Sequence, residues 1–168
     1  MSNIDQDIVK DFMVESKVLL RDLVDLLEKI EGDFSQVLRL GEYAQKVDRI
    51  AGGAKGLALM MPPEHVIHMV ADYAALCRVV GERASQINGN PQLYDVCVAL
   101  LLDATEALSE GVGALEKVRL ADELKNLLPK TFSERLRWVL NKFAADSKKV
   151  QKLDQNEIDN LLKKLGMF

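Results

Sequence analysis

The feature that most constrains the fold is a 3.6-residue apolar periodicity that recurs along the 168-residue chain. Leucine, alanine and valine supply most of the apolar positions, and aromatic residues make up only 5% of the chain. The first periodic stretch, residues 4–30, places one apolar face on a helix through Ile8, Phe12, Leu19, Leu23, Leu26, Leu27 and Ile30. Because no segment has the alternating pattern of a strand, the sequence predicts an all-α protein.

Glycine and proline divide this periodicity into separate helices with short connections. The breaks fall at Gly32, at Pro62-Pro63 and at Asn88-Gly89-Asn90-Pro91, where an asparagine can cap a helix and a proline fits its first turn. The predicted helices span, in order, residues 4–30, 35–60, 63–87, 91 to either Gly111 or Leu128, and 131–143. These lengths and short loops favour an antiparallel four-helix bundle with additional C-terminal helices.

The same pattern predicts three parts along the chain. Residues 1–143 form a helical bundle domain, residues 144–152 form a polar, flexible linker, and residues 153–168 form a short C-terminal peptide. A flexible linker of this length has a root-mean-square reach of roughly 15–18 Å.

Composition and charge limit the cellular compartment and the classes of partner that we expect. The formal net charge of −4 gives no reason to expect nucleic acid or a membrane surface as a partner. No apolar run is long enough to span a membrane, and residues 1–20 do not form a signal peptide. Cys77 and Cys97 lie within apolar helical patterns, which indicates buried thiols in a reducing compartment. We therefore expect a cytoplasmic protein.

The helix predicted over residues 35–60 has an unusual solvent face. Its apolar side carries Leu40, Tyr43, Ala44, Val47, Ile50, Ala51, Ala54 and Ala58. The opposite side carries Gln45, Arg49, Gly52 and Gly56, with Glu42 and Asp48 towards its two edges. A glycine inside a helix costs about 1 kcal/mol relative to alanine, and glycines on a solvent face do not help core packing. Bare backbone beside polar side chains favours close approach by another protein. A local kink or a glycine contact within a homodimer is the alternative.

The last sixteen residues predict a short amphipathic helix. Its apolar stripe consists of Ile158, Leu161, Leu162 and Leu165. Asp154 is a candidate N-cap, and Glu157 would complete a capping box. Because an isolated helix this short is marginal in water, the pattern favours a segment that folds when its stripe enters a groove on a partner. The alternative is an amphipathic helix that packs on its own domain.

The tail also resembles known ligands of chemotaxis response regulators. Residues 153–162 resemble the segment of the flagellar switch protein FliM that captures CheY, and residues 158–168 are similar to the C-terminal CheY-binding peptide of CheZ phosphatases. Met167 is an extra residue before the final aromatic. The resemblance implies a CheY-type response regulator as partner, contacted by Leu153, Gln155, Glu157, Ile158, Asp159, Leu161, Leu162, Leu165 and Phe168.

A second resemblance concerns the helix over residues 35–60. Val47-Asp48-Arg49-Ile50-Ala51-Gly52-Gly53-Ala54 resembles the His-Ser-Ile-Lys-Gly-Gly-Ala stretch of histidine phosphotransfer domains, and the likeness extends over residues 4–110. Those domains are four-helix bundles that present a phosphorylated histidine to a receiver, the phospho-accepting domain of a response regulator. Here Asp48 replaces that histidine and Ala51 replaces the lysine. The resemblance therefore implies a surface for docking a receiver, including Arg49, Gly52 and Gly56, without phosphotransfer through position 48.

His65 and His68 are the two histidines of the chain. His68 matches a position that supports the phosphorylated residue in phosphotransfer domains, so it is a candidate partner for Asp48 across the helix interface. An ordinary interhelical hydrogen bond is the simpler alternative, and a phospho-accepting role for either histidine is a third. Their spacing also fits metal ligation, but no cysteine or carboxylate cluster completes a ligand set, so we expect no metal site.

The chemistry of receiver dephosphorylation sets what a catalytic partner must supply. The receiver provides the Mg²⁺ ion, so its partner need only insert a side-chain amide that orients the attacking water, beside a charged group. Gln45 with Asp48 or Glu42 offers this pair, and Glu42-x-x-Gln45 is similar to the Glu-x-x-Asn pattern of other chemotaxis phosphatases. The Asp-x-x-x-Gln signature of CheZ is absent from the chain.

Two functions are consistent with these features. The first is a chemotaxis protein that binds a CheY-type regulator and promotes loss of its phosphoryl group, with no cofactor of its own. The second is a non-enzymatic, phosphotransfer-like adaptor that binds or sequesters the regulator. A homodimer is compatible with both.

Overall fold

The computed structural model describes residues 3–117, 130–146, 151–164 and 166. In these ranges the chain is helical and contains no strand, which confirms the predicted all-α class. The elements in order are α1 (Asn3–Ile30), the 3-10 helix η1 (Phe34–Gln36), α2 (Arg39–Ala58), α3 (Val66–Ala84), α4 (Pro91–Ala114), the 3-10 helix η2 (Leu115–Lys117), α5 (Lys130–Asp146) and α6 (Gln151–Lys164).

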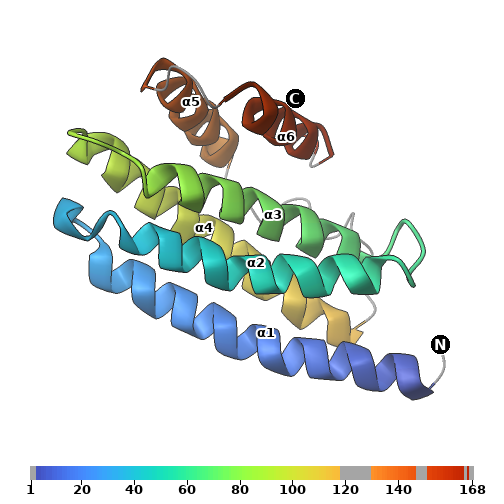
Figure 1. Ribbon diagram of the computed structural model, residues 1–168. Coiled ribbons are helices and arrows are strands. Elements are labelled where there is room, and N and C mark those ends of the chain that lie inside the picture. The colour runs from blue at the N-terminus through green and yellow to red at the C-terminus, as the bar shows by residue number, and fades with distance from the viewer. Residues whose placement is uncertain (1–2, 118–129, 147–150, 165, 167–168) are drawn as a thin grey trace.

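Helices α1 to α4 form a four-helix bundle. Each helix packs on the next in the chain, and α4 closes the bundle by packing on α1. Consecutive helices run in opposite directions, and α5 and α6 lie on the side of the bundle away from α1 (Figure 1). Helix α5 packs on α4, and α6 packs on α3. The predicted bundle with additional C-terminal helices is therefore confirmed.

Most of the core comes from the apolar stripes that the sequence predicts, but Ile8 of the first stripe is exposed at 42% and does not belong to the core. On α2, the seven positions from Leu40 to Ala54 on that stripe are buried, and Ala58 is partly buried against the core. On α5, the buried side chains are Phe132, Leu136, Val139, Leu140 and Phe143. Burying a leucine or phenylalanine side chain fully contributes about 1.5–3 kcal/mol, so these stripes account for the mutual packing of the helices.

A polar contact crosses the centre of the bundle. Tyr43 of α2 is fully buried, and its hydroxyl lies 2.9 Å from the Oγ1 of Thr105 on α4. The Thr105 hydroxyl donates to the Leu101 carbonyl at 2.6 Å, so Tyr43 is the donor to Thr105. A buried hydroxyl without a partner would cost about 1–3 kcal/mol, and this chain of hydrogen bonds avoids that cost.

Helices α2 and α3 approach each other closely at Gly81. A Cβ atom added there would lie 2.9 Å from Cδ1 of Tyr43. Since Tyr43 is held by packing and by its hydrogen bond, this ring has no room to retreat. Glycine at position 81 therefore sets the spacing of the two helices that carry the candidate site.

The connections between the helices lie at the glycine, asparagine and proline residues that the sequence predicts. Gly32 and Gly89 adopt positive φ angles of 73° and 64°, a region that glycine tolerates without strain. The Asn90 side chain accepts a hydrogen bond from the Leu93 amide, and Pro91 occupies the first turn of α4, as predicted. Tyr94 donates to the carbonyl of Ile30 at 2.6 Å and so satisfies the end of α1.

Several predicted boundaries were wrong by a few residues. Helix α3 begins at Val66 rather than at Pro63, because Pro62 to His65 form a hydrogen-bonded turn and His65, with an extended backbone, caps the helix through its side chain. The segment predicted as a helix from residue 35 divides into η1 and α2, with Asp33 capping η1. Helix α4 ends at Ala114, next to Gly113, and the predicted alternative end at Leu128 lies outside the described residues.

The C-terminal boundaries also differ from the prediction. Of the predicted linker, residues 144–146 continue α5 and residues 151–152 open α6, while residues 147–150 lie outside the described ranges. Asp154 lies in the first turn of α6 rather than at its N-cap, because no glycine or proline stops the helix upstream. The predicted capping box with Glu157 is therefore wrong.

Both cysteines are buried, as predicted. Burial raises the pKa of the Cys77 thiol to about 11 and that of the Cys97 thiol to about 12. The two thiols therefore stay protonated near neutral pH and act as small apolar core groups. None of the described helices has both the length and the apolar character needed to cross a membrane.

Candidate functional site

The exposed side of α2 carries the residues singled out in the sequence. We call this surface the α2 face; it consists of Glu42, Gln45, Asp48, Arg49, Gly52 and Gly56, all of which are exposed. Helix α2 is continuous through the glycines. A Cβ atom added at Gly52 or at Gly56 would meet nothing within 4 Å. Within the described part of the chain, these two glycines therefore provide no close packing, and they leave bare backbone on the surface.

Gly53 has a different environment from its neighbours on α2. A Cβ atom added at Gly53 would lie 2.9 Å from Cδ2 of Phe12 on α1. This glycine allows α1 and α2 to pack closely. The glycine-rich segment thus combines one position needed for the fold with two that the fold does not need.

Exposed ion pairs hold two charged members of the α2 face. Glu42 accepts from Nε of Arg39 at 3.2 Å, and Arg49 donates to Glu15 of α1 at 2.6 Å. Such exposed pairs contribute only about 0–1 kcal/mol. The side-chain amide of Gln45 makes no hydrogen bond within the described part of the chain. The polar groups of this face can therefore turn towards a partner at little energetic cost.

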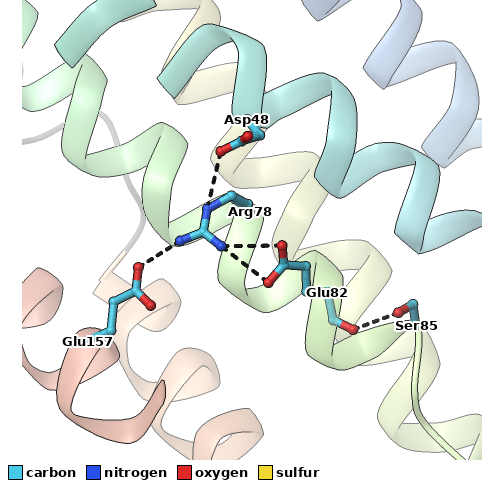
Figure 2. A network of polar contacts seen from close by, with 5 residues as sticks. All are labelled: Asp48, Arg78, Glu82, Ser85 and Glu157. Atoms are coloured by element: carbon cyan, nitrogen blue, oxygen red, sulfur yellow. Dashed lines mark hydrogen bonds and ion pairs between the residues drawn. The ribbon is translucent and has the colours of Figure 1, made fainter. Parts of the chain in front are cut away.

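Asp48 belongs to a cluster of carboxylates around one arginine, which we call the Arg78 cluster (Figure 2). Nε of Arg78 on α3 lies 3.4 Å from Asp48 of α2, and its Nη1 lies 3.2 Å from both carboxylate oxygens of Glu82. Its Nη2 donates to Glu157 of α6 at 2.6 Å. Ser85 donates to the Glu82 carbonyl at 2.6 Å. One guanidinium thus connects three helices.

The electrostatics of the Arg78 cluster favour the charged arginine. Burial by itself lowers the pKa of Arg78, but the carboxylates of Glu82, Glu157 and Asp48 outweigh it and raise that pKa overall. The Arg78 side chain is 20% exposed, while its partners are 43–63% exposed. Three carboxylates around one cation leave an excess of negative charge. The carboxylates therefore compete for the same guanidinium.

The predicted pairing of His68 with Asp48 is wrong. Nε2 of His68 donates to the carbonyl oxygen of Pro62 at 3.0 Å and lies 3.3 Å from that of Met61. Asp48 pairs instead with Arg78, ten residues further along α3, which corresponds to about 15 Å of helix. His68 lies too near the start of α3 to reach Asp48.

His65 has a structural contact of its own at the start of α3. Its Nδ1 accepts a hydrogen bond from the Ile67 amide at 3.2 Å. Burial, followed by the nearby charge of His68, lowers the pKa of His65, while Glu64 opposes this shift. Within the described residues, no group of three or more histidine, cysteine or acidic side chains could hold a metal ion.

The C-terminal helix lies along α3 in the opposite direction. Glu157 meets Arg78, and seven residues later the charge of Lys164 acts on Asp72, earlier in α3. Leu161 and Leu162, at 7% and 1% exposed, are buried where α6 packs on the bundle. This is the arrangement on its own domain that the sequence analysis gave as the alternative.

Among the other predicted contact residues of the tail, Asp159 is partly buried. Outside the described residues lie Leu165, Phe168 and the side chains of Leu153, Gln155 and Ile158.

Arg78 is the residue that sequence reasoning missed. It stands within an otherwise apolar stretch of α3 between Tyr73 and Gly81. Because a charged side chain rarely lies in such a stretch without a partner, this interruption was the available signal. Its partners lie on α2 and α6, at sequence distances that helical periodicity does not report.

Comparison with protein-family models, with curated proteins and with solved structures found no match to this chain.

Proposed function

We propose that this protein is a bacterial chemotaxis protein that binds a CheY-type response regulator and promotes loss of its phosphoryl group. The observation that carries the proposal is the α2 face, where Gly52 and Gly56 leave open backbone beside the Gln45 amide, which has no hydrogen-bond partner among the described residues. Two glycines each cost a solvent-facing helix about 1 kcal/mol, so a surface function accounts for them better than folding does. The resemblance of the tail to CheY-binding peptides supports the choice of partner.

The proposed chemistry is positioning rather than covalent catalysis. The bare backbone at Gly52 and Gly56 lets the receiver approach α2 closely, and Gln45, two turns before Gly52, supplies the amide that orients the attacking water. Arg49 can exchange its exposed pair with Glu15 for an acidic group on the receiver, since that pair contributes little to stability. The receiver supplies the Mg²⁺ ion and the phospho-aspartate.

The test is phosphate release from a phosphorylated, Mg²⁺-loaded CheY-type regulator in the presence of the full chain. We expect release faster than the regulator's own decay. Gln45→Ala should reduce the acceleration on the order of 10²-fold, because misplacing a reacting group costs about that much. Gln92→Ala, at an exposed glutamine of α4, is the matched control and should leave it unchanged. An unaltered decay rate with the unmodified chain would remove the enzymatic claim.

A second candidate is a non-enzymatic adaptor that sequesters the regulator. The observation that favours it is the engagement of the acidic groups of the α2 face, since Glu42 pairs with Arg39 and Asp48 pairs with Arg78. Such a face keeps Gln45 as its one free candidate group for catalysis among the described residues. The adaptor predicts binding of the regulator through α6 with an unchanged phosphate half-life, which the same assay distinguishes.

A further inference from the structure

We propose that α6 is an internal competitor of the regulator: docked on α3 it withholds its leucines, and the regulator binds only the fraction of molecules in which α6 has left the bundle. The inference rests on the proposed function for the identity of the competing partner. It adds a closed state and an open state of the same binding segment, with the Arg78 cluster joining that segment to the α2 face.

The first step is the shared use of two side chains. Leu161 and Leu162 belong to the apolar stripe by which the tail would enter a groove on the regulator, and both are buried against the bundle in this structure. A leucine that is 1% exposed at one interface has no surface left for another. Docking on α3 and capture by a partner are therefore mutually exclusive.

The second step is that, among the described residues, α6 packs extensively on one helix alone. Within the described residues its extensive packing is with α3, and Asn156, Asn160 and Lys163 are exposed on its outer side. A helix held on one side is among the first units of a protein to open. Helix α6 can therefore leave without unfolding the four-helix bundle.

The third step is the polar contact that holds α6 in place. Glu157 accepts from Arg78 at 2.6 Å, the shortest contact of the Arg78 cluster. When α6 leaves, Arg78 keeps Glu82 on its own helix and Asp48 on α2 as partners. With one competitor removed, the guanidinium is free to strengthen its contact with Asp48. Release of α6 thereby changes the contact of Asp48, which lies at the edge of the α2 face.

The expected size of the effect follows from population arithmetic. The apparent dissociation constant of the full chain equals the intrinsic constant of the open tail divided by the open fraction. Removing an ion pair of this kind raises the open fraction about two- to fivefold. The affinity for the regulator should therefore rise by the same factor, although the change removes a contact and adds none.

The first experiment follows backbone hydrogen exchange in α6 of the full chain without a partner. Arg78→Gln should speed exchange of the α6 amides about two- to fivefold, and Arg78→Lys should retain most of the protection. The matched control is Arg135→Gln, which removes an interhelical ion pair between α5 and Asp103 of α4 at 3.2 Å and should leave α6 unchanged. Exchange in α6 that is fully unprotected, or equal in the unmodified chain and Arg78→Gln, overturns the inference and leaves the proposed function untouched.

The second experiment titrates the same proteins with a phosphorylated CheY-type regulator. Arg78→Gln should bind about two- to fivefold more tightly than the unmodified chain, and Arg135→Gln should bind equally. Binding that is the same for all three overturns the competition but supports the proposed function. No binding by any of them, with α6 exchange still responding to Arg78→Gln, contradicts the proposed function and removes the regulator as the competing partner.

Discussion

At the scale of single residues, the clearest separation of folding from function lies in the glycines of α2. Gly53 has a ring of α1 at 2.9 Å from any added Cβ atom, whereas Gly52 and Gly56 face open space. Glycine is thus required for packing at one position and is unexplained by packing at the other two. A substitution at Gly52 or Gly56 that stabilises the fold but weakens binding would show that these two glycines serve the binding surface.

Alanine at Gly52 or Gly56 should stabilise the protein and impair its action on the regulator. Each change should add about 1 kcal/mol through helix propensity, which corresponds to a rise in Tm of roughly 2–4 °C for a protein of this size. The added methyl group should also hold the receiver away from α2 and slow phosphate release. Thermal unfolding and the phosphate-release assay measure the two effects.

Gly53→Ala is the matched control for that pair of effects. Its methyl group would meet Phe12, so it should gain less stability than the other two or lose some. If Gly52→Ala and Gly56→Ala raise Tm without any loss of activity, the α2 face is not where the receiver docks.

At the scale of elements, α3 begins with an unusual cap. The neutral Nδ1 of His65 accepts from the Ile67 amide, and its pKa lies below the ordinary value of 6.5 mainly because of burial. A lowered folded-state pKa means that the unfolded chain binds the proton more readily. The contribution of neutral His65 to the free energy of unfolding is therefore fully present above about pH 6.5. It is lost as the pH falls through the lowered pKa of the folded state.

Replacing this histidine with asparagine should remove that pH dependence. His65→Asn keeps a side-chain acceptor at the N-cap and does not titrate, so between about pH 7.5 and pH 5 it should lose less stability than the unmodified chain. His65→Ala should cost about 1 kcal/mol near neutral pH through loss of the cap. Denaturant unfolding at the two pH values measures both. An equal pH dependence in the unmodified chain and His65→Asn would show that the cap does not titrate in this range.

The helices could be predicted from sequence because their causes are local. Pro91 behind Asn90 starts α4, Gly32 follows the end of α1, and the stripe from Leu40 to Ala58 identifies the buried side of α2. The exposed α2 face follows from that stripe as its opposite side. These are properties of a single helix, which a 3.6-residue period specifies completely.

The partner of Asp48 and the docking position of α6 could not be predicted in this way, because they depend on contacts between helices. The sequence offers His68 as a candidate partner for Asp48, but the geometry of two packed helices pairs Asp48 with Arg78. The stripe of α6 suits a foreign groove and the side of α3 equally, since an apolar face does not specify its own partner. Only the arrangement in three dimensions shows Leu161 and Leu162 on the bundle.

At the scale of the whole molecule, the bundle and α6 should respond differently to loss of a core leucine. Leu136 of α5 and Leu162 of α6 are 0% and 1% exposed, so burial alone does not distinguish them. Leu136→Ala should cost about 2–5 kcal/mol because it leaves a cavity in a fixed core. Leu162→Ala should release α6 and leave the Tm of the bundle nearly unchanged, with a small loss of helical circular dichroism. Equal losses of Tm would mean that α6 is an integral part of the core.

Under the proposed function, this chain captures a CheY-type response regulator through α6. The most direct measurement is a calorimetric titration of the full chain with phosphorylated regulator, comparing the unmodified protein with the double variant Leu161→Ala, Leu162→Ala. The proposed capture requires saturable binding by the unmodified protein and its loss in the double variant, with the bundle still folded by circular dichroism. Undetectable binding by the unmodified protein, or equal binding by both, would contradict it.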